Sequence, residues 1–194
     1  MSGSAEARSS RSHGRPPPPR WGWHRLTEPW AERIVAQASI SPGELVLDIG
    51  AGTGALTAPL VTAGARVIAI ELHPQRAQLL RDRFDGNRVR VLQVDVSDLR
   101  LPRRPFRVVA NPPFGLTTAL LRRLLHRHSQ LVRADLVVPH HVAARWSAGR
   151  GSDARRWTTQ FAAVQGLRLP GHAFVPPPPN PVSLLRLQRR SSAN

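Results

Sequence analysis

The 194-residue sequence contains no cysteine, no lysine and no tyrosine, and only 12 acidic residues. The absence of cysteine excludes disulfide bonds and thiolate metal sites, and it carries no information about the cellular compartment. No apolar run approaches the roughly 18 residues that a membrane-spanning helix needs. The first 20 residues lack the apolar segment of a secretory signal peptide. We therefore expect a cytoplasmic protein, with export by a route without such a peptide left open.

What the chain has in excess is positive charge. All 28 basic residues are arginine, and the formal net charge is +16. So positive a charge on so small a chain indicates a polyanionic partner, above all nucleic acid. The planar guanidinium group suits such a partner, because it forms paired hydrogen bonds to phosphate and stacks on bases.

Apolar strands and amphipathic helices alternate along most of the chain. The expected helices cover residues 28–38, with Thr27 as N-cap, 55–63, 75–84, 116–126 and 140–147, and the expected strands cover 45–47, 66–70, 89–94, 106–110 and 136–138. This alternation predicts an α/β fold with right-handed crossovers and a mostly parallel sheet. A loop over 149–154 and two strands over 157–168 and 182–188 predict an antiparallel hairpin at the sheet edge.

The length fits one domain with short extensions at both ends. Residues 1–20 form an arginine-, serine- and proline-rich arm that we expect to be disordered. The folded domain is expected over 21–190, with a tail over 191–194.

A glycine-rich turn, Gly50-Ala51-Gly52-Thr53-Gly54, follows one strand directly and opens a helix. Glycines there allow a tight turn and a close approach of the backbone to a ligand. The next strand ends in Glu71, which can accept hydrogen bonds from both ribose hydroxyls of a nucleotide. The spacing is tighter than that of dinucleotide sites, and it favours S-adenosylmethionine over NAD.

Two further acidic residues stand at strand ends. Asp95 follows the third strand and could accept a hydrogen bond from the adenine amino group of the cofactor. Asp48 precedes the glycines and could orient the turn and the amino-acid part of the cofactor. In open parallel sheets the ligand lies across the carboxyl ends of the strands, where these acids fall.

The fourth strand ends in Asn111-Pro112-Pro113-Phe114. The prolines stiffen the turn and leave its carbonyls free. The Asn111 side-chain oxygen and the Pro112 carbonyl can together hold the two hydrogens of a planar amino group, so that its nitrogen faces a methyl donor. Catalysis would then be mainly positioning, with no strong base. Phe114 would stack on the substrate plane.

Four stretches resemble the ribosomal-RNA adenine N6-methyltransferases of the erythromycin-resistance methylase and dimethyladenosine transferase superfamily. They are the glycine turn with residues 54–57, Ala69-Ile70-Glu71-Leu72 with Arg76-Ala77, the segment from Asn111 to Ala119 with residues 121–125, and the segment from Ala173 to Pro179 with Val182 and residues 184–187. The third of these stretches, from Asn111 to Ala119 with residues 121–125, closely resembles the erythromycin-resistance branch.

The resemblance implies a Rossmann-like class I methyltransferase with a seven-stranded, mostly parallel sheet, and N6-methylation of an adenine in 23S rRNA at the macrolide-binding region, which confers antibiotic resistance. The partner would be 23S rRNA or a precursor of the large ribosomal subunit, and the protein would act as a monomer. The residues expected to contact S-adenosylmethionine are Trp23, His24, Leu26, Asp48, Gly50, Ala51, Gly52, Glu71, Leu72, Asp95, Val96 and Asn111, and those expected to act on the target are Asn111, Pro112 and Phe114.

The chain departs from the family pattern at three places. Gly22-Trp23-His24-Arg25-Leu26 replaces the usual Gly-Gln-Asn/His-Phe-Leu, so Trp23 would have to cover the methionine end of the cofactor. The Pro-Pro pair is more typical of DNA adenine and protein glutamine methyltransferases. We expect no counterpart of the family's C-terminal helical domain within these 194 residues. The basic arm and surface arginines could substitute for it in binding RNA.

Two other functions remain open at this point. One is a protein N-methyltransferase acting on a side-chain nitrogen of a ribosomal or chromatin-like protein, and the other is a non-catalytic RNA-binding module. No metal is expected, because no carboxylate cluster accompanies the histidines at 126, 128, 140 and 141 and because the mechanism needs none.

Overall fold

The computed structural model describes residues 24–84, 86 and 88–190. The predicted arm, the C-terminal tail and Trp23 lie outside the described residues. No described helix is long and apolar enough to cross a membrane. Within the same ranges, no group of three or more His or acidic side chains is placed to hold a metal ion.

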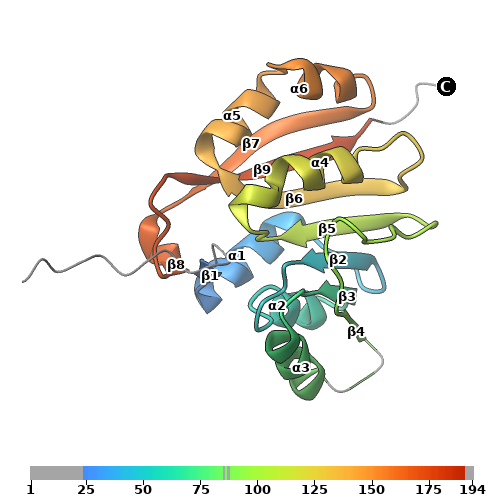
Figure 1. The fold of residues 1–194 in the computed structure, drawn as a ribbon, viewed down its shortest axis with the longest axis vertical. Coiled ribbons are helices and arrows are strands. Elements are labelled where there is room, and N and C mark those ends of the chain that lie inside the picture. The colour runs from blue at the N-terminus through green and yellow to red at the C-terminus, as the bar shows by residue number, and fades with distance from the viewer. Residues whose placement is uncertain (1–23, 85, 87, 191–194) are drawn as a thin grey trace, which may run out of the picture.

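A seven-stranded sheet forms the centre of the molecule, in the order β4-β3-β2-β5-β6-β9-β7 (Figure 1). The strands are β2 Leu45–Ile49, β3 Arg66–Ile70, β4 Val89–Leu92, β5 Phe106–Ala110, β6 Leu131–Pro139, β7 Phe161–Leu169 and β9 Val182–Arg189. The five strands from β4 to β6 are parallel, and β9 runs antiparallel to both β6 and β7. This confirms the predicted α/β fold, including its C-terminal antiparallel hairpin.

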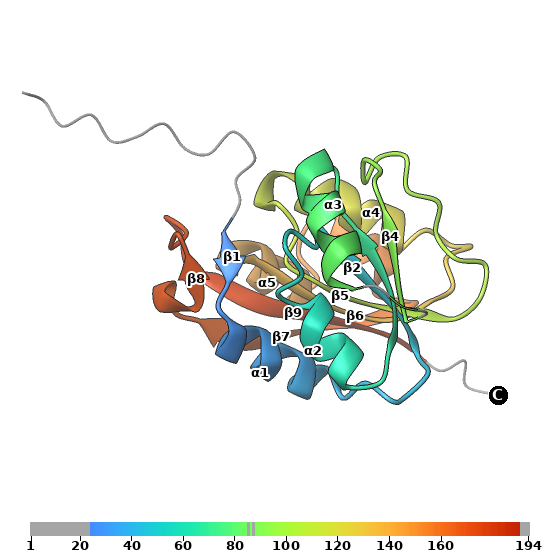
Figure 2. The same ribbon diagram turned by 90° about the horizontal axis from the view of Figure 1, so that it is seen from below.

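Helices cover both faces of the sheet. They are α1 Glu28–Ala38, α2 Thr57–Thr62, α3 Pro74–Arg83, α4 Thr117–Leu124, α5 His140–Ser147 and α6 Ser152–Trp157, with 3₁₀ turns at Phe114–Leu116 and Gly171–Ala173. Apolar residues of α1 and α2 pack with Val46, Val67 and Val109 of the sheet, whereas α4 and α5 pack on the other face with Leu47 and Val108. Figure 2 shows α1 and α2 on one side of the sheet and α4 on the other.

The sequence-based boundaries were wrong in three places. Residues 149–154, predicted as a loop, contain the start of α6, and the strand predicted from Trp157 begins at Phe161. Strand β6 begins at Leu131 rather than at residue 136. The prediction missed its first residues because Arg133 and Asp135, which pair with each other inside the strand, interrupt the apolar pattern. Thr27 precedes α1 as predicted, but its side chain makes no capping hydrogen bond.

A two-stranded ribbon joins the start of the described chain to the segment before β9. Strand β1, Arg25–Leu26, pairs antiparallel with β8, Phe174–Val175. Leu26 and Phe174 are buried in the same cluster as α1. The segment that follows the N-terminal arm is therefore fixed against the segment that precedes β9.

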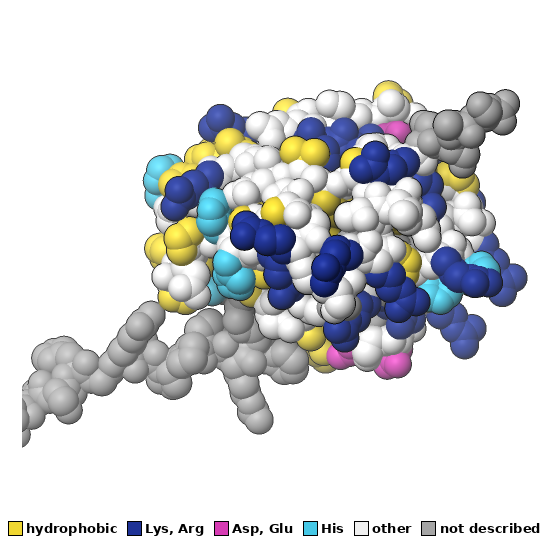
Figure 3. Space-filling view, turned by 90° about the horizontal axis from the view of Figure 1, so that it is seen from above, with side chains coloured by type: hydrophobic (Ala, Val, Ile, Leu, Met, Phe, Trp, Pro, Cys, Tyr) yellow, Lys and Arg dark blue, Asp and Glu magenta, His cyan; other side chains and the backbone are white. Residues whose placement is uncertain are grey.

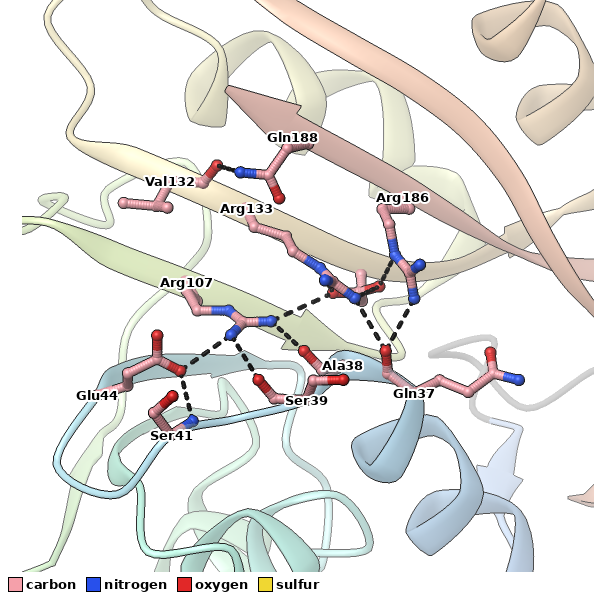
Figure 4. Close-up of polar contacts among 11 residues, drawn as sticks. Gln37, Ala38, Ser39, Ser41, Glu44, Arg107, Val132, Arg133, Arg186 and Gln188 are labelled. Atoms are coloured by element: carbon pink, nitrogen blue, oxygen red, sulfur yellow. Dashed lines mark hydrogen bonds and ion pairs between the residues drawn. The ribbon is translucent and has the colours of Figure 1, made fainter. Parts of the chain in front are cut away.

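Three arginines from the sheet close the C-terminal end of α1 (Figure 4). Asp135 of β6 is fully buried and pairs with Arg133 at 2.7 Å and with Arg186 of β9 at 2.9 Å. Arg107 of β5 lies 4.0 Å from Asp135 and pairs with Glu44 at 2.9 Å. The guanidinium groups donate to the carbonyls of Gln37, Ala38 and Ser39. Because these carbonyls lack partners within a helix, the arginines act as its C-terminal cap.

Candidate active site

A cavity of about 480 Å³ opens at the carboxyl ends of the parallel strands. Nine of the residues proposed from the sequence line it together: His24, Gly50, Glu71, Leu72, Asp95, Val96, Asn111, Pro112 and Phe114. Its volume is within the range of about 300–1,000 Å³ that is usual for small-molecule sites. The cavity thus joins the proposed cofactor residues to the proposed reaction residues.

The glycine turn lies directly against the Asn-Pro-Pro-Phe turn. Gly50 has φ +75°, and a Cβ added to it would lie 3.2 Å from Pro113 Cδ and 3.4 Å from Pro112 Cα. The amides of Gly50 and Ala51 both donate to the carbonyl of Ile70 at the end of β3. A side chain at position 50 would be strained and would push the two turns apart.

Glu71 holds the glycine turn in place by a hydrogen bond. Its Oε2 accepts from the Gly52 amide at 2.9 Å, its Oε1 accepts from the His73 amide at 2.9 Å, and Arg76 lies 3.7 Å from Oε1. A carboxylate has about four acceptor positions, so both oxygens can still accept from a further donor. The side chain is therefore rigidly placed and still able to bind ribose hydroxyls.

Asp95 is half-buried at the cavity wall, just after β4. Its Oδ1 accepts from both the amide and the hydroxyl of Ser97, each at 2.8 Å. These hydrogen bonds hold the pKa of the Asp95 carboxyl below its usual value, so it is ionised at neutral pH. Within the described part of the chain, Oδ2 has no hydrogen bond and is left to accept from an adenine amino group.

Asp48, Ala51 and Leu26 line a separate small cavity of about 20 Å³ behind the glycine turn, together with Gly50 and Asn111, which also line the large cavity. Asp48 is buried and accepts from the Thr57 hydroxyl at 2.7 Å. Burial raises the pKa of the Asp48 carboxyl to about 7, with the nearby Glu71 charge adding to the rise. Asp48 thus lies behind the turn rather than on the wall of the large cavity.

We expect Asp48 to make the free energy of unfolding depend on pH. Its folded pKa is raised, so the folded protein binds the proton more tightly than the unfolded chain, and stability falls as pH rises from about 4 to about 7. Between about pH 5 and about pH 8 the loss is roughly 3 kcal/mol. Denaturant unfolding of the wild type and of Asp48→Asn at both pH values checks this. Parallel pH profiles of the two proteins would contradict it.

Among the described residues, the Asn111 side chain is held from one side only. Its Nδ2 donates to the His24 carbonyl at 2.7 Å, which orients the amide and leaves Oδ1 for another donor. The Phe114 ring is stacked with the His24 ring, with centroids 5.7 Å apart and an interplanar angle of 25°. The His24 Nδ1 is 2.9 Å from the Pro176 carbonyl. His24 thus connects the N-terminal segment, the reaction turn and the segment after β8.

The rest of the cavity wall consists of residues that were not proposed as contacts from the sequence: Ile70, His73, Arg76, Val94, Pro113, Gly115, Leu116 and Pro179. Most of them belong to or adjoin the motifs, but nothing in the sequence indicated that their side chains face the cavity. Pro179 is different, because it reaches the cavity from a loop after β8, far from the other residues in sequence.

Similarity to known proteins shows the family of the chain. The pattern of the family described as ribosomal RNA adenine dimethylase matches residues 24–194. The ribosomal RNA small subunit methyltransferase A of Thermosynechococcus vestitus is 38% identical over 173 residues, which cover 82% of this chain and 64% of that protein. The chain belongs to the ribosomal RNA adenine dimethylase family. Members of this family are rRNA adenine N6-methyltransferases that use S-adenosylmethionine.

Two further proteins are similar to this chain. An rRNA adenine N-6-methyltransferase of Corynebacterium diphtheriae is 36% identical over 136 residues, which cover 69% of this chain and 53% of that protein. The crystal structure of the 23S rRNA methyltransferase ErmE superposes with a TM-score of 0.79 at 24% identity, over 86% of this chain and 70% of that one. The latter likeness shows the fold. The chain spans 64% of the length of the first of these curated relatives and 53% of the length of the second.

Proposed function

We propose that the protein transfers a methyl group from S-adenosylmethionine to N6 of an adenine in ribosomal RNA. The observation that carries this proposal is the position of Asn111, in the same cavity as Glu71 and Asp95 and with its Oδ1 free to accept. When bound, S-adenosylmethionine supplies an electrophilic methyl group. Glu71 would bind its ribose and Asp95 its adenine, and the backbone of Gly50 would lie against it. Leu26, Asp48 and Ala51 line the small cavity and would support the glycine turn, and the Gly52 amide would hold Glu71 in place.

The chain's own residues would do their work by orientation. The target amino group would donate one hydrogen to Asn111 Oδ1 and the other to the Pro112 carbonyl, so that the nitrogen faces the cofactor side of the cavity. Phe114, with Leu72 and Leu116 at the rim, would hold the flat base by apolar contact and stacking. The Nδ2 bond to the His24 carbonyl keeps the amide in the accepting orientation. Holding the two reactants in this geometry would supply a large part of the rate acceleration, so the reaction would need no strong base.

The distribution of charge supports an RNA partner. Residues 100–194 contain 16 arginines and only two acidic residues, whereas residues 24–99 contain 8 arginines and 9 acidic residues. Exposed arginines lie on and around α4, α5 and α6, at positions 122, 127, 145, 150, 155 and 156. Figure 3, which views the molecule from the side of α5 and α6 in Figure 1, shows many dark-blue and few magenta side chains. Helix α4 starts next to the reaction turn, so this basic surface adjoins the cavity.

For the RNA itself, we propose 23S rRNA at the macrolide-binding region. The support is the run from Asn111 to Ala119 with residues 121–125, which resembles the erythromycin-resistance branch. A second candidate is 16S rRNA, because the relative at 38% identity is named as a small subunit methyltransferase. Both candidates use the same cavity and the same chemistry.

The test is methyl transfer from labelled S-adenosylmethionine to purified 23S rRNA, 16S rRNA, both ribosomal subunits and a basic protein, followed by mapping of the label. Label on N6 of one adenine of 23S rRNA, with macrolide resistance of a host that expresses the protein, is the expected result. Label on 16S rRNA would replace the 23S proposal and keep the chemistry. Label on protein alone would overturn the rRNA proposal and favour a protein N-methyltransferase.

A further inference from the structure

A second groove lies at the opposite end of the sheet from the proposed active site. It has a volume of about 660 Å³ and is lined by the amino-terminal ends of β2, β3 and β4 and by the loop before β5. Four of its lining residues are arginines, Arg66, Arg88, Arg90 and Arg104, and none of the residues lining it is acidic. All four arginine side chains are exposed.

The register of the sheet places three of these arginines on one face. Ile68 of β3 pairs with Arg90 of β4, and Val67 pairs with Val89. Because side chains alternate along a strand, Arg66 shares the face of Ile68, and Arg88 shares the face of Arg90. One residue earlier in the same register, Arg66 and Arg88 become neighbours on strands that lie about 4.8 Å apart. Like charges this close repel each other, and a bound anion would relieve the repulsion.

Three other arginines of the same half of the chain have polar partners. Arg76 pairs with Glu71, Arg83 donates to the Thr53 carbonyl, and Arg81 donates to Gln78. In the described ranges, the side chains of the four groove arginines make no hydrogen bond or ion pair. Pro42, Gly43 and Gly64 also line the groove, and the space beside Gly43 is open, since a Cβ added there would meet nothing within 4 Å. A phosphate group could therefore come close to the backbone.

We propose that this groove, defined by Arg66, Arg88, Arg90 and Arg104, binds the phosphodiester backbone of the RNA substrate at a point remote from the methylated adenine. The inference rests on the proposed function, because it takes the partner to be RNA. Strand β3 has five residues, so the groove lies roughly 16 Å from the cavity along the strand direction. One strand of nucleic acid advances about 3.4 Å per nucleotide, so roughly five nucleotides are needed to cover that distance. A folded rRNA segment can therefore reach both sites, whereas a trinucleotide bound in the cavity cannot.

The experiment compares two triple variants with equal loss of charge. The groove variant carries Arg66→Gln, Arg88→Gln and Arg90→Gln, and the control carries Arg33→Gln, Arg81→Gln and Arg168→Gln, three exposed arginines outside the groove. Affinity for a folded rRNA domain is measured at several salt concentrations. Each lost phosphate contact should reduce the slope of log affinity against log salt by roughly 0.7–0.9. The groove variant should lose about 2 to 3 units of slope and the control less than about 1.

Methylation provides the second measurement. We expect the groove variant to methylate a folded rRNA domain at least about tenfold less efficiently than the control at moderate salt, and to methylate a trinucleotide, which is too short to reach the groove, equally well. Unchanged binding of S-adenosylmethionine shows that both variants are folded. Equal salt slopes for the two variants would overturn the groove proposal and leave the proposed function standing. A wild type that methylates no RNA would overturn the proposed function, and the slopes would still report on the groove.

Discussion

Replacement of Asn111 by alanine is expected to abolish methyl transfer while the protein stays folded and keeps its affinity for S-adenosylmethionine. The side chain has two separate tasks: Nδ2 donates to the His24 carbonyl at 2.7 Å, and Oδ1 is the acceptor for the target amino group. Alanine removes both, so the base is no longer held at the angle that transfer requires. Misplacement of a reacting group by about 1 Å costs on the order of 100-fold, and we expect kcat to fall by at least that factor.

The measurement is a single-turnover methylation rate on saturating rRNA, together with calorimetric binding of S-adenosylmethionine. The Kd for the cofactor should change by less than about tenfold, because Glu71 and Asp95 remain in place. Asn180→Ala is a matched control, since Asn180 also precedes a proline and is exposed. An Asn111→Ala protein with a wild-type rate would refute the proposed role and would favour a binding module without catalytic activity.

Replacement of Asp135 by alanine is expected to cause the largest loss of stability. The carboxylate is fully buried and holds Arg133 and Arg186 at 2.7 and 2.9 Å, with Arg107 at 4.0 Å. Removing one partner of a buried ion pair typically costs about 3–5 kcal/mol, because the other charges stay behind without compensation. Without the carboxylate, the three guanidinium groups would repel each other, and their hydrogen bonds to the carbonyls at the end of α1 would weaken.

Thermal and denaturant unfolding measure this effect. For a chain of this size the expected loss corresponds to a decrease in Tm of roughly 10 °C. Glu44→Gln is the control, because Glu44 pairs with the same Arg107 at 2.9 Å but its side chain is 34% exposed. Its loss should be about 1 kcal/mol or less. Equal losses of unfolding free energy in the two variants would contradict the conclusion that the burial of Asp135 makes its ion pairs important for stability.

Much of the fold and of the candidate site could be predicted from the sequence, because both depend on local patterns. Apolar strands followed by acids or glycines define the carboxyl edge of a parallel sheet, and so Glu71, Asp95 and Asn111 could be expected to meet. Their presence around one cavity agrees with that expectation. The ligands themselves remain proposals, and Trp23 lies outside the described residues.

What could not be predicted depends on contacts between distant segments. The excess of arginine indicated a polyanionic partner, but Arg107, Arg133 and Arg186 serve the fold by capping α1. Nothing local distinguishes them from exposed arginines, because the distinction lies in Asp135, buried on β6 among them. The contact of His24 with Phe114 likewise needs the β1–β8 ribbon, which joins segments about 150 residues apart.

The place of β9 has a consequence for the order in which the protein is made. The last strand lies between β6 and β7, and β8 holds the segment that contains His24. A growing chain that ends at β7 already contains the parallel strands β2 to β6. It still lacks β9, which joins β7 to those strands, and the segment after β7 that positions His24. Synthesis must therefore proceed almost to residue 189 before the cavity takes its final shape. Active protein would appear only after nearly the whole described chain has left the ribosome that makes it.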